Sequence, residues 1–509
     1  MPDHTHFDTL IVGGGLAGLV AATQLAREGQ KVRLLERSTA LGGRARTTYA
    51  AGHALNLGPH ALYRAGALAE ALKELDVAID AHRVAPTGFF LDGDARHTAV
   101  TGFASLLTTG ALTLAGKVEL ARFMARMKSF DADALARTTV QRFFDDTFAD
   151  DSARRVALAL ARLTTYADDP AHLSAGALLG QLVSGTYAGV DYVDGGWTAI
   201  VDGLAEAARE AGAELVTGAR VERVERTDDG FVVGVRSPSR AEPERGADHT
   251  EHIAGIAERS AHHVERSADI DERSADIADH AASVAERRAD IDERGAHHAE
   301  RGAHHAERSI DHGAEPTALV HADRVILALD PTTCARLFPC PALDKIAARA
   351  RPVRAASLDV ALSRLPDPRA IFALGLDEPT YFSVHSVWAD VAPRGAATIH
   401  AAAYLGPDDA HTPEGTRAML ERTLDRMQPG WREVVVHERF LPNLVVTPDA
   451  PDADRGGLAG RPDVDAAGVE GLLIAGDWVG PTGMLADAAA ASGRAAAAHA
   501  VTRRTRAVA

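Results

Sequence analysis

The pattern of apolar positions near the N-terminus predicts a β-α-β unit. Residues 9–12 form a short, largely apolar run, as in a strand that is buried in a parallel sheet. From Leu16 the apolar residues recur at spacings of three and four, which is typical of an amphipathic helix. A second apolar run over residues 32–35 predicts the next strand, and Glu36 follows it directly. This order predicts an α/β fold of the Rossmann type.

A glycine-rich turn joins the first strand to the helix. Gly13, Gly15 and Gly18 match G-x-G-x-x-G, in which the glycines permit a tight turn, close approach to a pyrophosphate, and close helix–strand packing. The amides at the helix N-terminus favour phosphate. Glu36 is placed to accept hydrogen bonds from ribose hydroxyls, and its charge disfavours the 2′-phosphate of NADP. The residues predicted to bind a dinucleotide in this unit are Gly13, Gly15, Leu16, Ala17, Gly18, Glu36 and Arg37.

Two further segments indicate FAD in place of NAD. Gly43 and Arg44 offer close backbone approach and a cationic donor to a diphosphate. Near the other end of the chain, an apolar strand over residues 471–475 leads into Asp477, whose carboxylate suits a polyol hydroxyl such as the ribityl chain. An alanine-rich helix follows, and its N-terminus favours negative charge on a reduced flavin. The predicted cofactor residues of these segments are Gly43, Arg44, Gly476 and Asp477.

Strand patterns flank an unusual repeat in the middle of the chain. Residues 218–226 and 230–237 predict two strands joined by a turn, and residues 318–331 predict two more. Between them, over residues 244–313, a seven-residue unit occurs ten times, and its fourth position is alanine in nine copies. Alanine alone makes a weak coiled-coil seam, so we expect a solvated insertion, disordered or a loose helix. Metal capture by its histidine pairs is the alternative; otherwise no metal site is expected.

Composition narrows the class of protein. The formal net charge of −17 disfavours nucleic acid as a partner. With two cysteines, neither a disulfide framework nor a cysteine metal cluster is expected. The N-terminus lacks the pattern of a secretory signal and no apolar run is long enough to span a bilayer, so a cytoplasmic location is expected. Residues 103–125 are rich in Leu, Ala and Phe; they predict an apolar tunnel or peripheral contact with a membrane surface, or an ordinary buried helix pair.

Taken together, these motifs resemble the flavin amine oxidase / phytoene desaturase superfamily, which includes protoporphyrinogen oxidase-like flavoenzymes. The stretches that carry the resemblance are 9–60, Gly195-Gly196-Trp197 with the helix after it, Val221 to Val224, 328–331 and 471–496. The resemblance implies FAD as the cofactor. It also implies that the backbone of Val221 meets the adenine and that Gly483, Met484 and Leu485 meet the flavin ring.

Three departures from the family pattern bear on the reaction. Asn56 stands where many members have aspartate, and Asp487-Ala488-Ala489 replaces a usual Glu-Gly-Ala. The lysine that amine oxidases usually carry shortly after the 328–331 strand is missing from this segment. These departures favour the desaturase-like branch over amine oxidation. His60, Tyr63 and Trp478 are candidates for the flavin face by adjacency to motifs, with packing as the alternative for each; the catalytic residues remain unassigned.

The predicted organisation is an α/β Rossmann-type FAD-binding domain, a discontinuous mixed α+β substrate domain and the heptad-repeat insert. The FAD-binding domain comprises residues 1–80, 190–243, 314–335 and 430–509, and the substrate domain residues 81–189 and 336–429. The glycine cluster at 456–460 predicts a loop, so no second dinucleotide fingerprint exists. The predicted function is oxidation of a small hydrophobic, isoprenoid-like substrate by FAD, with electrons passed to oxygen, a quinone or another acceptor. The alternatives are amine oxidation and a non-catalytic binding protein on the same fold.

Overall fold

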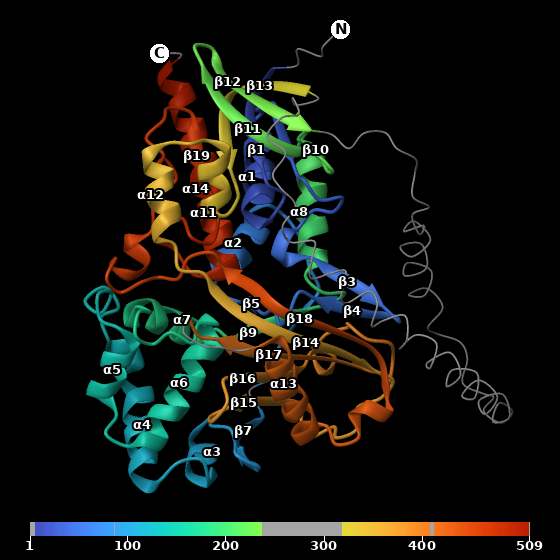
Figure 1. Ribbon diagram of the computed structural model, residues 1–509, viewed down its shortest axis with the longest axis vertical. Helices are drawn as coiled ribbons and strands as arrows, with labels where there is room; N and C mark the ends of the chain where they lie inside the picture. Colours follow the sequence, from blue (N-terminus) through green and yellow to red (C-terminus); the bar gives the residue numbers. More distant parts are fainter. Residues whose placement is uncertain (1–5, 86, 237–317, 408–411, 508–509) are drawn as a thin grey trace, which may run out of the picture. The chain divides into compact units, whose positions relative to one another are not determined.

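A seven-stranded sheet surrounds the N-terminal glycine turn. The computed structural model describes residues 6–85, 87–236, 318–407 and 412–507. The strands of this sheet, in spatial order, are β10 (Glu214–Val216), β2 (Val32–Leu35), β1 (His6–Val12), β13 (Ala318–Leu327), β12 (Gly230–Arg236) and β11 (Arg220–Thr227), with β19 (Leu472–Ile474) also paired to β13 (Figure 1). The pairs β10–β2, β2–β1, β1–β13 and β13–β19 are parallel, and β11, β12 and β13 are antiparallel. The predicted β-α-β unit is confirmed.

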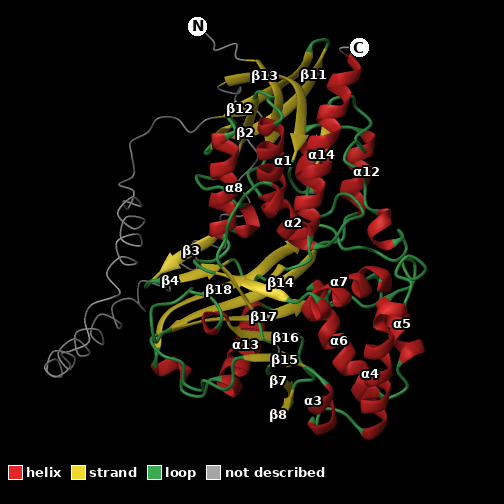
Figure 2. Ribbon diagram, turned by 180° about the vertical axis from the view of Figure 1, so that it is seen from behind, coloured by secondary structure: helices red, strands yellow, loops and turns green. Residues whose placement is uncertain are grey.

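Helices pack against both faces of this sheet, because successive side chains of each strand point to opposite faces. Ile11 faces a core formed with α1 (Leu16–Arg27), α2 (Ala67–Glu74), α8 (Thr198–Glu210) and α14 (Leu485–Ala507). Its neighbours Leu10 and Val12 point to the opposite core, which contains α11 (Pro331–Leu337) and α12 (Pro341–Arg349). Figure 2 shows α1, α8 and α14 side by side on their face. The sheet is therefore buried on both faces, as expected for parallel strands.

The segment after the repeat differs from its prediction. Residues 318–331 predict two strands, but residues 318–327 form the single strand β13, so that prediction is wrong. The first half of β13 pairs with β12, where Ala318 lies opposite Val235, and the second half pairs with β19, where Val325 lies opposite Leu472. The short strands β12 and β19 therefore each pair with one half of the long strand β13. A pattern of side chains along one segment does not contain this information.

The predicted hairpin of β11 and β12 is confirmed, and the heptad repeat that follows it lies outside the described residues. The described ends of β12 and β13 are adjacent antiparallel partners. We therefore expect that replacing residues 244–313 by a short Gly-Ser turn preserves folding and FAD content, since loop length changes closure entropy only slowly. Circular dichroism and the flavin spectrum of the purified deletion variant test this. Insoluble or flavin-free protein would contradict it.

A second seven-stranded sheet packs against a helical bundle. Its strands, in spatial order, are β18 (Val435–Thr447), β14 (Val353–Leu362), β17 (Ala397–Leu405), β16 (Thr380–Val384), β15 (Phe372–Gly375), β7 (Phe89–Asp92) and β8 (Ala95–Thr98). On β17, Ile399, Ala401 and Ala403 face a core with α13 (Pro413–Met427). Ala402 and Tyr404 face the bundle of α3 (Phe103–Thr108), α4 (Leu114–Arg126), α5 (Val140–Thr147), α6 (Asp151–Thr165) and α7 (Ala175–Tyr187).

Smaller elements connect these two parts. A hairpin of β3 (Thr47–Ala50) and β4 (His53–Asn56) and a three-stranded sheet of β5 (Leu62–Tyr63), β9 (Val190–Val193) and β6 (Ala81–Arg83) complete the strands. Residues 457–460, predicted as a loop, form a short 3-10 turn. In the part of the chain that the structure describes, no helix combines the length and the apolar character needed to cross a membrane. The boundaries of the two domains stay a prediction.

Candidate functional site

One large cavity connects the glycine turn to the helical bundle. Its volume is about 1190 Å³, and both sheets contribute to its wall. One end is lined at the carboxyl ends of β1 and β2, where ligands bind in open parallel sheets. The other end reaches α4, α6 and α7. Of the residues predicted to bind the cofactor, those that line it are Gly13, Gly15, Leu16, Ala17, Glu36, Arg37, Gly43, Arg44, Val221, Gly476, Asp477, Met484 and Leu485.

The three motif glycines have different surroundings. A Cβ atom on Gly18 would lie 2.0 Å from the carbonyl oxygen of Gly13, so Gly18 allows α1 to pack against the turn, outside the cavity wall. Gly13 adopts a φ of +109°, which favours glycine. Gly15 has ordinary dihedral angles, and no atom lies within 4 Å of its Cβ position. Its open side therefore provides room for a group that approaches the backbone closely.

The N-terminus of α1 and the end of β2 complete the nucleotide end. No side chain caps the first turn of α1, so its amides remain suited to phosphate. Glu36 accepts hydrogen bonds from the backbone N–H groups of Gly14 and Ser38, each at 2.8 Å. Its carboxylate is thereby held at the cavity wall. Val221 lies where the pairing of β11 with β12 is irregular, between residues 221 and 223, which frees backbone groups beside the cavity.

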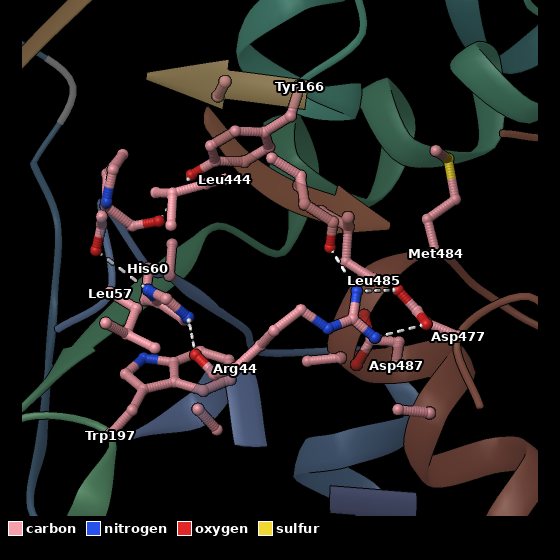
Figure 3. A pocket seen from close by; sticks show the side chains of 18 of the residues that line it. Arg44, Leu57, His60, Tyr166, Trp197, Leu444, Asp477, Met484, Leu485 and Asp487 are labelled. Carbon is pink, nitrogen blue, oxygen red and sulfur yellow. Dashed lines mark hydrogen bonds and ion pairs between the residues drawn. The ribbon is translucent and has the colours of Figure 1, made fainter. Parts of the chain in front are cut away.

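Arg44 and Asp477 form a two-point ion pair at the middle of the cavity (Figure 3). Both guanidinium NH2 groups of Arg44 donate to the Asp477 carboxylate at 2.7 Å. The residues are 433 positions apart in sequence. Asp477 is almost fully buried, whereas Arg44 is half-exposed. The predicted diphosphate donor and the predicted polyol acceptor therefore meet, and each orients the other.

The start of α14 brings a carboxylate to the same wall. Leu485 adopts a positive φ of 53°, an uncommon conformation for a non-glycine residue, as it turns the chain into the helix. Gly483 lies behind the wall, where its carbonyl oxygen accepts a hydrogen bond from Arg461. Asp487, in the first turn, accepts a hydrogen bond from the N–H of Leu68 at the start of α2. Burial raises the pKa of Asp487 to about 6.

This raised pKa predicts how stability depends on pH. The folded protein binds the Asp487 proton more tightly than the unfolded chain does, so the free energy of unfolding falls as pH rises from about 4 to about 6. We expect this group to account for about 3 kcal/mol of that fall, and Asp487→Asn to remove it. Urea unfolding of the flavin-free protein at several pH values measures the difference. Asp146→Asn, an exposed carboxyl on α5, is the control; an unchanged slope in Asp487→Asn would refute the assignment.

The three flavin-face candidates have different positions. His60 and Tyr63 line the cavity. Trp478 does not: it is buried in the core beneath the first sheet, and its indole N–H donates to the Leu329 carbonyl at 2.9 Å. Trp478 therefore packs in the core and does not face the cavity. Burial raises the pKa of Tyr63 to about 12, so its hydroxyl stays protonated.

His60 is held between two backbone carbonyls and an indole ring (Figure 3). Its Nδ1 lies 3.0 Å from the Gly58 oxygen and its Nε2 3.2 Å from the Arg44 oxygen. The ring of Trp197 lies 4.8 Å away, centroid to centroid. Burial lowers the pKa of His60 to about 4, so the imidazole is neutral at pH 7 and donates from one nitrogen only.

Asn56 has a structural role that explains one departure from the family pattern. Its Oδ1 accepts hydrogen bonds from the N–H of Trp197 at 2.9 Å and from the hydroxyl of Thr47 at 2.7 Å. These contacts tie β3 and β4 to the Gly195-Gly196-Trp197 turn. Both use the amide oxygen as an acceptor, so an asparagine suffices where a carboxylate oxygen would serve equally.

Sequence patterns did not reveal several aromatic side chains of the cavity wall. Tyr166, Tyr192, Tyr381 and Trp388 line the cavity. Tyr166 follows α6 with a positive φ of 59°, and its hydroxyl donates to the Pro59 carbonyl at 3.0 Å. The hydroxyls of Tyr192 and Tyr381 lie 3.1 Å apart. These tyrosines come from separate helices and strands, and no spacing in the sequence connects them.

The residues present fit a flavin dinucleotide. The uncapped N-terminus of α1 can bind an anion, and the open side of Gly15 leaves space for a pyrophosphate. The carboxylates of Glu36 and Asp477 can accept hydrogen bonds from hydroxyl groups. The same cavity is also lined by residues of α4, α6 and α7. Whether each named residue contacts FAD stays a prediction.

Comparisons with known proteins agree with this site. Residues 16–249 match the family of flavin containing amine oxidoreductases. The chain is 29% identical over 265 residues to a phytoene dehydrogenase of Streptomyces griseus, covering 43% of this chain and 49% of that protein. It is 28% identical over 273 residues to a carotenoid 3,4-desaturase of Haloarcula japonica, covering 46% and 53%. The matched region thus spans about half the length of these curated relatives.

Solved structures share the fold over nearly the whole chain. A putrescine oxidase bound to putrescine matches with a TM-score of 0.64 at 16% identity, covering 98% of this chain and 100% of that one. An oxidoreductase from Methanosarcina mazei matches with a TM-score of 0.65 at 16% identity, covering 96% and 99%. The fold and the family match define a flavoprotein of the FAD-dependent oxidoreductase class. Within that class, residues 16–249 are similar to flavin containing amine oxidoreductases, and about half of the chain is similar to a phytoene dehydrogenase and a carotenoid 3,4-desaturase.

Proposed function

We propose that this protein dehydrogenates or desaturates a hydrophobic, isoprenoid-like substrate, with electrons passed from FAD to oxygen, a quinone or another acceptor. The observation that carries this proposal is the apolar character of the cavity beyond the flavin site. The residues that line this end include Phe90, Leu120, Phe123, Met124, Met127, Leu160, Leu163, Leu182, Phe372 and Leu374. Such a lining favours a substrate that is held by burial of hydrocarbon surface.

The distribution of carboxylates supports the same substrate class. The acidic residues that line the cavity are Glu36, Asp330, Asp477 and Asp487. All four belong to segments around the first sheet, and none comes from α4, α6, α7 or the second sheet. A cationic substrate in the apolar end would therefore have no counter-charge on the described wall. Burying a charge without a partner is costly, whereas a hydrocarbon has no such cost.

The chain's own residues supply binding, orientation and exclusion of water. FAD, when bound, supplies the two-electron acceptor. The apolar walls desolvate the substrate, and the neutral imidazole of His60, whose nitrogens face the Gly58 and Arg44 carbonyls, adds no charge to the cavity wall. The two relatives named for carotenoid chemistry support the proposal, although the match spans about half of each of them.

Amine oxidation is the second candidate, and one observation favours it. The cavity wall carries the aromatic rings of Tyr63, Tyr166, Tyr192, Trp197 and Tyr381, and aromatic faces attract cations. The structural likeness to a putrescine oxidase agrees with this alternative only at the level of the fold. An amine would bind among these rings near the flavin, short of the apolar end.

Anaerobic reduction of the flavin distinguishes the two candidates. The FAD-loaded protein is mixed with a C40 polyene in detergent micelles, with putrescine, or with NADPH, and the visible flavin absorbance is followed. We expect bleaching by the polyene, recovery of colour on adding oxygen or a quinone, and no bleaching by NADPH. Bleaching by putrescine alone would favour amine oxidation. No bleaching by any compound would favour a non-catalytic binding protein.

A cavity variant tests where the substrate lies. Leu163→Asp places a carboxylate in the apolar end of the cavity, at a position that is not predicted to bind FAD. It is expected to raise KM for the polyene by about tenfold or more while FAD content is unchanged. Leu163→Met, which conserves volume and polarity, is the matched control and should behave as wild type.

A further inference from the structure

One arginine lines the cavity at its apolar end. Arg83, on β6, contributes to the wall together with Thr186 at the end of α7 and Gly189 just after it. A Cβ atom on Gly189 would lie 3.3 Å from both Nε and Nη2 of Arg83, so the guanidinium lies directly beside the chain that leaves α7. Leu182, on the same helix, belongs to the apolar lining. The charge of Arg83 is therefore placed next to a wall that otherwise suits hydrocarbon.

Helix α4 contributes one of its faces to the same end of the cavity. Leu120 and Phe123 line this end. The exposed fractions of Phe103 on α3 and Leu114 on α4 are 75% and 81%. The alternative of an ordinary buried helix pair for residues 103–125 is therefore wrong, because each helix buries only one of its faces. The inner face of α4 is part of the apolar wall.

Arg83 has no ion-pair partner in the part of the chain that the structure describes. It lies opposite Asp191 in the pairing of β6 with β9, where a carboxylate could neutralise it. Arg64 engages that carboxylate instead, through contacts of 2.8 and 3.1 Å. The neighbouring carboxylate of Asp194 lies 2.9 Å from Nε2 of His82. The guanidinium of Arg83 therefore keeps its hydrogen-bond donors available for another group.

Polar and basic side chains surround Arg83 at the rim of this end. Arg83 is exposed, and the other exposed polar residues that line the cavity here are Thr87, Thr101 and Thr186. A second cation lies beside them, because Nζ of Lys128 is 3.6 Å from the ring centroid of Tyr187, the residue after Thr186. The apolar end of the cavity therefore has a rim that combines hydroxyl groups with positive charge.

No carboxylate of the described cavity wall competes for Arg83. The acidic residues that line the cavity all belong to segments around the first sheet. The whole chain has a net charge of −17, so the positive rim is a local feature and does not follow from composition. A guanidinium suits a carboxylate in particular, because its planar fork donates two parallel hydrogen bonds.

We propose that the substrate is an apolar carboxylate whose anionic end binds Arg83 while its hydrocarbon body fills the cavity between α4, α6 and α7. This inference rests on the proposed function, to which it adds a charged end group on the hydrophobic substrate. Arg83 is then a specificity-determining residue. Because one end is anchored at the rim, the distance between the carboxylate and the reacting carbon atoms decides which bond of the hydrocarbon reaches the flavin.

Binding of cis-parinaric acid, a fluorescent polyene carboxylate, tests this site. The full-length, FAD-loaded protein is titrated with the acid and, separately, with its uncharged methyl ester. We expect wild type to bind the acid about tenfold or more tightly, because the ester loses a charge-assisted hydrogen bond. Arg83→Gln should remove this preference by weakening the acid alone, and Arg83→Lys, which keeps the charge without the fork, should retain part of it. Arg394→Gln, which removes an exposed arginine outside the cavity wall, is the matched control.

Leu163→Asp separates a failure of this inference from a failure of the proposed function. It should weaken binding of the ester, and of the acid at least as much, because both hydrocarbon bodies lie in the apolar end. Equal affinity of wild type for acid and ester, with both weakened by Leu163→Asp, would overturn the role of Arg83 and leave the apolar site standing. Unchanged affinity of Arg83→Gln for the acid would overturn that role as well. If neither compound binds, or if Leu163→Asp changes nothing, the hydrophobic substrate and its anchored end are both refuted. Flavin content and thermal unfolding confirm that each variant is folded.

Discussion

Replacement of Gly15 by valine is expected to abolish FAD binding and leave the fold intact. The Cβ position of Gly15 has no neighbour within 4 Å, and its dihedral angles, φ −80° and ψ −177°, are accessible to valine. The new side chain therefore meets no protein atom at its root and projects from the cavity wall. It occupies the space that a pyrophosphate needs next to the backbone. We expect FAD affinity to fall about 100-fold or more, about 3 kcal/mol.

Two measurements separate this loss of binding from loss of structure. Titration with FAD, followed by flavin fluorescence, gives the affinity, and urea unfolding of the flavin-free protein gives the stability. Gly180→Ala is the control: it also has open space at its Cβ position and lies on α7, outside the cavity wall. By contrast, Gly18→Val should unfold the protein, because its Cβ would lie 2.0 Å from a backbone oxygen. Wild-type FAD affinity in Gly15→Val would show that the pyrophosphate lies elsewhere.

Replacement of Asp359 by alanine is expected to lower the free energy of unfolding by about 3–5 kcal/mol, the usual cost of removing one partner from a buried ion pair. Asp359 is fully buried on β14, where its Oδ1 lies 2.6 Å from Nδ1 of His400 and its Oδ2 accepts from Arg439 at 2.6 Å. Arg439 also donates to backbone carbonyls of β4. Without Asp359, a guanidinium that joins β18 to β4 would lose its counter-charge.

The pH dependence of this contribution has a definite sign. Burial alone would raise the pKa of Asp359, but His400 and Arg439 outweigh it and hold the pKa below its usual value. The stabilisation is therefore present above the unfolded pKa of about 4 and is lost as pH falls below it. Urea unfolding at pH 7 and at acidic pH should show the difference between wild type and Asp359→Ala shrinking with acid.

A surface pair provides the control for Asp359. Asp146→Ala removes the partner of Arg142 on α5, where both side chains are more than 70% exposed. Its effect on the free energy of unfolding should stay within about 0.5 kcal/mol. An effect of Asp359→Ala as small as this would mean that the buried pair contributes nothing net to stability.

Local sequence patterns were sufficient to predict the nucleotide end of the site. The strand, glycine turn, helix and second strand over residues 6–35 lie close to their predicted positions. Each of these elements depends on neighbours only a few positions away in the sequence. Strand β19 and the hairpin of β11 and β12 follow the same rule. The glycines needed no tertiary information either, since a turn that approaches a phosphate excludes most other residues.

Contacts between distant segments could not be predicted from local patterns. Arg44 meets Asp477 across 433 positions, and Asp359 meets Arg439 and His400 from different strands. Trp478 follows a cofactor motif directly, yet its ring turns into the core, because the direction of a side chain depends on the layers packed around it.

The sequence by itself therefore determined the class of this protein: a Rossmann-type dinucleotide unit with FAD as the cofactor of an oxidoreductase. Only the tertiary structure decided that β13 is one strand with two partners, that four aromatic residues from separate elements share the cavity wall, and that α3 and α4 turn apolar side chains both inward and outward. The physical reason is the sequence separation of the residues whose interactions decide each feature. Backbone turns, caps and periodic burial are decided within one or two turns of chain, whereas a cavity is the space left between layers that the whole chain must first assemble.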